Sequence, residues 1–85
     1  MSKLEKAKNR IKAIPKDYTY LEAKSLLNQL GFEEDNKGKT SGSRVKFYRK
    51  SDGQIFLLHK PHPLSVMSIG RVRDLEEFLE FLGEI

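Results

Sequence analysis

Two histidines are the residues of this sequence best suited to acid–base chemistry. His59 and His62 flank Lys60 in a segment whose two prolines, Pro61 and Pro63, disfavour regular structure and predict a loop. A histidine with its ordinary pKa of about 6.5 can accept the proton of a ribose 2′-hydroxyl. A nearby cation would stabilise the charge that then develops on the phosphate. The alternative is a pair of hydrogen-bonding surface histidines, because H-x-x-H without further ligands is a weak metal motif.

A polar segment, residues 37–43 with the sequence Lys-Gly-Lys-Thr-Ser-Gly-Ser, is a second candidate binding element. Its backbone amides, the ammonium groups of Lys37 and Lys39 and the hydroxyl of Ser43 could approach phosphate oxygens. The alternative is an ordinary polar turn. The chain has no nucleotide-binding glycine motif, and we expect neither a cofactor nor a metal. We expect the three tyrosines either to stack on bases or to lie half-buried with solvent-exposed hydroxyls; they are Tyr18, Tyr20 and Tyr48.

The charge distribution favours a polyanionic partner. Residues 36–73 hold nine basic side chains and one acid, whereas residues 74–85 hold five acids and no base. A domain with one basic face is expected to attract nucleic acid. The alternative is that these charges only keep a small domain in solution. Besides the two lysines of the polar segment, the basic residues expected at phosphates are Arg44, Lys46, Lys60, Arg71 and Arg73.

Apolar residues at helical spacing precede the basic region. Ser2 is the candidate N-cap of a first helix that Pro15 ends. Thr19 and Glu22 form a capping box for a second helix, and Gly31 stands where a left-handed residue would end it. The inward-facing residues of these two helices are Leu4, Ala7, Ile11 and Ile14, followed by Ala23, Leu26, Leu27 and Leu30.

Strand periodicity marks the centre of the chain. Residues 44–49 alternate, which predicts a strand with one buried and one exposed face. The buried face carries Val45 and Phe47, with Arg49 next in the same phase. The exposed face carries Arg44, Lys46 and Tyr48. Asp52-Gly53 predicts a hairpin turn because both residues tolerate positive φ angles. Residues 54–58 predict the next strand, central in the sheet or covered on both faces because its apolar run is continuous. Residues 32–35 are a short candidate strand.

Helical spacing returns after the proline segment. A third helix should begin at Ser68 or Gly70 and end at Gly83. Phe78 and Phe81 widen its apolar stripe, and with the five nearby acids they offer a surface for a protein partner as an alternative function. The core residues of this helix are Val72, Leu75, Leu79 and Leu82.

A single domain accounts for residues 1–85. The 38% apolar residues can form one core, and the absence of cysteine excludes disulfides and suits a reducing cytoplasm. The longest apolar run, Ile55 to Leu58, is too short to cross a bilayer, so no membrane association is expected. The order helix, helix, three strands, helix predicts an α+β fold with a three-stranded antiparallel sheet and helices on one face.

Three segments resemble the HicA (YcfA-like) toxin family. They are Leu26 to Phe32, Gly38 to Phe47, and Leu57 to Pro63 with its Leu-Leu-His-Lys-Pro-His-Pro sequence. The likeness covers residues 19–82, and residues 1–14 are an added N-terminal helix. The resemblance implies a double-stranded-RNA-binding-domain-like α-β-β-β-α fold, mRNA cleavage, and neutralisation by a HicB-type antitoxin.

This chain departs from the family at the position of its catalytic histidine. Family toxins usually carry that histidine directly after a Gly-Ser pair, and here Gly42-Ser43 is followed by Arg44. Either His59 serves as the base, with His62 as the lesser candidate, or the chain binds RNA without cleaving it. The oligomeric state is not indicated by the sequence.

Overall fold

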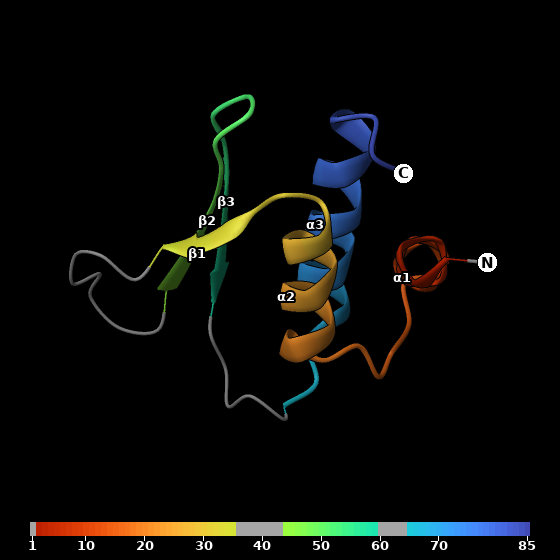
Figure 1. Cartoon of the computed structure of the whole chain (residues 1–85). Helices are drawn as coiled ribbons and strands as arrows, with labels where there is room; N and C mark the ends of the chain where they lie inside the picture. The colour runs from red at the N-terminus through yellow and green to blue at the C-terminus, as the bar shows by residue number, and fades with distance from the viewer. Residues whose placement is uncertain (1, 36–43, 60–64) are drawn as a thin grey trace.

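A computed structural model describes residues 2–35, 44–59 and 65–85, with the side chains of Arg44 and His59 left aside. Three helices and three strands follow one another in the expected order (Figure 1). Their bounds are α1 Lys3–Lys12, α2 Tyr20–Gln29, β1 Glu33–Asp35, β2 Arg44–Arg49, β3 Gln54–His59 and α3 Ile69–Phe81. The α+β class with a three-stranded antiparallel sheet is confirmed.

The helices begin at the side chains that the sequence predicts. The hydroxyls of Ser2, Thr19 and Ser68 each accept a hydrogen bond from the amide three residues later, at 3.1, 3.2 and 3.3 Å. Such caps satisfy amides that lack partners within a helix. Gly31 and Gly83, which follow α2 and α3, have φ angles of 93° and 78°, as predicted for residues in the left-handed region.

The helices form two layers above one face of the sheet. Helices α2 and α3 lie against the sheet, and α1 lies on their far side (Figure 1). The ring of Phe78 on α3 packs 4.7 Å from that of Phe56 on β3 and 5.9 Å from that of Phe32. Because α1 lies beyond α2 and α3, it extends the core away from the sheet.

No helix in the described part of the chain has the length and apolar character needed to cross a membrane.

The position of β3 corrects the sequence prediction. The sheet order is β1-β2-β3, so the central strand is β2 and β3 lies at an edge. Leu58 is buried, whereas Ile55 and Leu57 are 46% and 52% exposed, so only one face of β3 is covered. The continuous apolar run led to a prediction of burial on both faces of this strand. In the structure only alternate side chains of the run enter the core.

Two smaller expectations also change. Residues 50–53 join the cross-strand partners Arg49 and Gln54, and only Gly53 in this turn has a positive φ, at 69°. The turn lies where the sequence predicts it, but Asp52 does not adopt the left-handed conformation that a two-residue Asp-Gly hairpin would need.

Phe81, expected to widen the core stripe of α3, is 85% exposed.

Arg49 is a charged side chain on the helix-covered face of the sheet. It lies in phase with Val45 and Phe47 and is only 8% exposed. Its guanidinium donates to Asp52 through Nε and Nη2, at 3.0 and 2.6 Å, and through Nη1 to Glu84 Oε2 at 2.8 Å. Nη1 also donates to the Leu30 carbonyl at 3.2 Å. These hydrogen bonds join the hairpin turn, the end of α2 and the C-terminal segment.

The polar contacts of Arg49 are completed by close packing. Its guanidinium carbon lies 4.7 Å above the centre of the Phe32 ring, within the range of a cation–π contact. A Cβ added at Gly31 would lie in van der Waals contact with Arg49 Cδ, at 3.4 Å, so it is the φ of 93° that disfavours a side chain there. Hydrogen bonding to Arg49 lowers the pKa of the Asp52 carboxyl.

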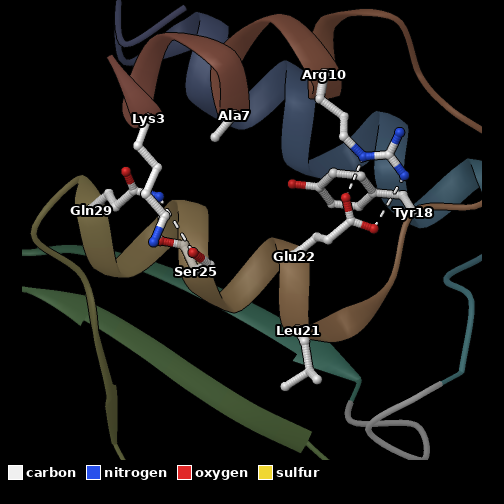
Figure 2. Close-up of a pocket in the computed structure, with 8 residues that line it drawn as sticks. All are labelled: Lys3, Ala7, Arg10, Tyr18, Leu21, Glu22, Ser25 and Gln29. Carbon is white, nitrogen blue, oxygen red and sulfur yellow. Dashed lines mark hydrogen bonds and ion pairs between the residues drawn. The ribbon is translucent and has the colours of Figure 1, made fainter.

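Helix α1 is attached to α2 through a second arginine (Figure 2). Arg10 pairs with Glu22 through Nε and through Nη2, the latter at 3.2 Å, and Nη2 also donates to Asp17 Oδ1 at 3.1 Å. Glu22 Oε1 accepts from the Thr19 amide at 3.1 Å as the second half of the capping box. One carboxylate thus begins α2 and binds α1, and hydrogen bonding to Arg10 lowers the pKa of Glu22.

We predict that Arg49→Met lowers the free energy of unfolding by about 2 to 3 kcal/mol. The substitution keeps the length of the side chain but removes hydrogen bonds to two carboxylates and leaves the Leu30 carbonyl without this donor. Urea unfolding followed by circular dichroism would measure the change. Lys50→Met, next to it but exposed, is the control and should change stability by no more than about 0.5 kcal/mol. Equal stability of Arg49→Met and wild type would contradict the role assigned to Arg49.

A second prediction concerns how the contribution of Glu22 to the free energy of unfolding changes at acidic pH. The lowered pKa of Glu22 means that its ion pair contributes above the pKa of an unfolded glutamate, about 4.3, and is lost as pH falls through the lower folded value. Glu22→Gln should therefore be less stable than wild type at pH 7, and the difference should shrink as the pH is lowered to about 3. Urea midpoints across this range would test it, with the exposed Glu33→Gln as control. A difference independent of pH would contradict this account.

Candidate nucleic-acid interface

One end of the sheet gathers the residues proposed for chemistry. Asp35 at the end of β1 pairs with Lys46 near the start of β2, and Arg44 pairs with His59 at the end of β3. The 50–53 turn lies at the opposite end (Figure 1). Segments 36–43 and 60–64 are therefore both joined to the sheet at this end, which we call the loop end, defined by Asp35, Arg44 and His59.

The sequence around the loop end is cationic. Residues 36–44 and 59–64 contain four lysine or arginine residues, both histidines and no acid. Arg44 is the direct cross-strand partner of His59, which the sequence alone did not indicate. The predicted residues that lie outside the described part of the chain are Lys37, Lys39, Ser43, Lys60 and His62.

Lys46 and Tyr48 lie on the sheet face away from the helices. They alternate with the buried Val45 and Phe47, and both are half-buried, in agreement with the predicted exposed face of this strand. Lys46 Nζ is 3.8 Å from Asp35 Oδ2, so binding of a phosphate by this lysine would compete with a weak ion pair. Tyr48 is flanked across the sheet by Glu33 on β1 and Ile55 on β3.

Arg71 and Arg73 belong to a different part of the surface. Both are exposed in the first turns of α3, in the layer of helices rather than on the open sheet face. Helix α3 begins at the end of the molecule where β3 finishes (Figure 1). The two arginines therefore do not join Lys46 and Tyr48 on one face.

Two of the three tyrosines are core residues. Tyr18 and Tyr20 are 1% and 2% exposed, so they neither stack on bases nor lie half-buried as the sequence suggested. The Tyr20 hydroxyl donates to Glu34 Oε2 at 3.0 Å, and the Arg10 guanidinium lies 5.7 Å from the Tyr18 ring centre. Burial raises the pKa of both phenols. Only Tyr48 remains available on the surface.

Arg49 is one of the nine bases of the positively charged region, but its side chain is committed to structure. Asp52 and Glu84 compensate its charge, which leaves it unsuited to bind phosphates. The sequence indicates this structural role, because Arg49 occupies the inward phase of its strand two residues after Phe47.

Within the described residues, no group of three histidine, cysteine or acidic side chains is arranged to hold a metal ion.

Two other surface features lie away from the loop end. A groove of about 260 Å³ between α1 and α2 is lined by residues that include Lys3, Leu21 and Gln29 (Figure 2). On α3, Phe81 stands beside Glu76, Glu77 and Glu80, and partial burial together with a hydrogen bond to Glu80 raises the pKa of Glu76. Docking of a protein partner on this acidic helix remains a prediction.

Comparisons of the chain with protein-family models, with curated proteins and with solved structures found no match.

Proposed function

We propose that this chain is a HicA-like toxin that binds mRNA at the loop end of its sheet and cleaves it there. The observation that carries the proposal is the direct pairing of His59 with Arg44 at a sheet end to which two acid-free, lysine-containing segments are joined. The order of α2, the three strands and α3 is consistent with the double-stranded-RNA-binding-domain-like fold that the family likeness implies. A HicB-type antitoxin in the cytoplasm would neutralise the activity.

The proposed reaction is a metal-independent transfer of the phosphodiester bond. The His59 imidazole accepts the proton of the ribose 2′-hydroxyl, and the 2′-oxygen then forms a bond to phosphorus. The bond to the 5′-oxygen breaks, and that oxygen takes a proton from solvent, which leaves a 2′,3′-cyclic phosphate and a 5′-hydroxyl. Arg44 and Lys60 would stabilise the additional negative charge of the phosphorane.

The base assignment predicts a pH-dependent cleavage that His59→Ala abolishes. Because the base must be unprotonated, cleavage of a long unstructured RNA in excess EDTA should rise through the ordinary histidine pKa of about 6.5. We expect the rate to fall at least about 100-fold in His59→Ala, and by a smaller factor in Arg44→Gln. Circular dichroism would verify that both variants fold. Activity that survives in His59→Ala would direct attention to His62 or to a contaminating nuclease.

Binding can be tested separately from cleavage. Lys39→Glu and Lys60→Glu should weaken the affinity for single-stranded RNA and reduce the slope of log K against log salt by about 0.7 for each phosphate that the variant no longer binds. Lys50→Glu is the matched control, because Lys50 is an exposed lysine in the turn at the opposite end of the sheet. Salt-sensitive binding without cleavage at any pH would identify a non-catalytic RNA-binding domain of the same fold. Equal effects of all three variants would contradict binding at the loop end.

A further inference from the structure

The outer edge of β3 has the properties of a strand that pairs with another strand. Within the described residues, β3 pairs with β2 on one side only. Its six residues, Gln-Ile-Phe-Leu-Leu-His, contain no acid, lysine, arginine or proline. On the open sheet face Ile55 and Leu57 are 46% and 52% exposed. An uncharged edge with exposed apolar side chains is a template for strand addition.

The opposite edge of the same sheet is protected. Strand β1 has only three residues, Glu33, Glu34 and Asp35, and every one is acidic. Short length and charge are the usual means by which an edge strand avoids pairing with its own copy. The two edges of the sheet therefore differ: the β1 edge has features that prevent pairing with another strand, and the β3 edge lacks them.

We propose that β3 pairs with β3 of a second copy of this chain, antiparallel, to form a continuous six-stranded sheet. A two-fold contact is self-complementary, and an uncharged strand meets its copy without like-charge repulsion. Antiparallel pairing also places the two cationic loop ends at opposite ends of the joined strands, about 13 to 20 Å apart depending on the register. A parallel arrangement would bring those ends together.

The alternation of side chains limits the register of such a pair. Directly opposed residues in an antiparallel ladder share a face of the sheet. Ile55 of one copy opposes Leu57 of the other in one register, which pairs all four exposed apolar side chains. In the alternative register Leu57 opposes Leu57, and Ile55 then opposes position 59 of the other copy. One edge of six residues buries less surface than a standard interface, so the dimer should be weak and dependent on concentration.

Analytical ultracentrifugation of the RNA-free protein, from micromolar to millimolar concentration, tests the dimer. We expect a reversible monomer–dimer equilibrium and an increase of at least about tenfold in its dissociation constant for Leu57→Lys, which places two lysines at the joint. Leu21→Lys is the matched control, because Leu21 is 48% exposed on α2, and it should dimerise as wild type does. A monomer throughout this range, or equal effects of the two variants, would overturn the proposal.

Amide hydrogen exchange distinguishes pairing of edges from contact between the open faces. Edge pairing predicts that β3 amides directed away from β2 become protected at high protein concentration and lose this protection in Leu57→Lys. A dimer whose outward β3 amides exchange as fast as those of the monomer would be held by another surface and would overturn the proposal. Because neither measurement contains RNA, failure of the dimer would leave the proposed RNA cleavage untouched.

Discussion

The guanidinium of Arg49 joins the parts of this small domain that lie far apart in its sequence. A cation on the buried face of a sheet is costly unless its charge and its hydrogen bonds are satisfied. Here two carboxylates and a helix-end carbonyl meet that requirement, with an aromatic ring beneath the guanidinium. The last turn of α2, the β2–β3 turn and the C-terminal segment therefore take positions that are fixed relative to one another. The loop end of the sheet, at the other end of β2, is built on this fixed frame.

Local chemistry makes most of the helices predictable. Ser2, Thr19 and Ser68 mark helix starts because their hydroxyls replace missing partners of helix amides, which requires only neighbouring residues. The edge position of β3 requires knowledge of which strand becomes the neighbour of which. An apolar run of four residues is compatible with a central strand and with an edge strand that covers one face. The third layer formed by α1 likewise depends on tertiary packing rather than on its own spacing.

The candidate site is predictable in its residue types but not in its arrangement. Charge counting singles out the basic region, and strand register then makes Arg44 and His59 direct neighbours. The same counting includes Arg49, because a sum of charges does not distinguish a cation in solvent from one already paired with carboxylates, whereas the strand period places Arg49 in the buried phase with Phe47. The prediction for Tyr18 and Tyr20 is wrong because both rings are core residues: the Tyr20 hydroxyl finds a protein acceptor in Glu34, and the Tyr18 ring packs beneath the Arg10 guanidinium.

Glu22 gives the N-terminal helix an influence greater than its remote position suggests. The same carboxylate caps the first turn of α2 and holds Arg10 of α1. Detachment of α1 would leave that carboxylate without its principal cation, and fraying of the start of α2 would release Arg10 in turn. The two events are thus thermodynamically coupled, so α1 and the first turn of α2 should open together as one cooperative unit.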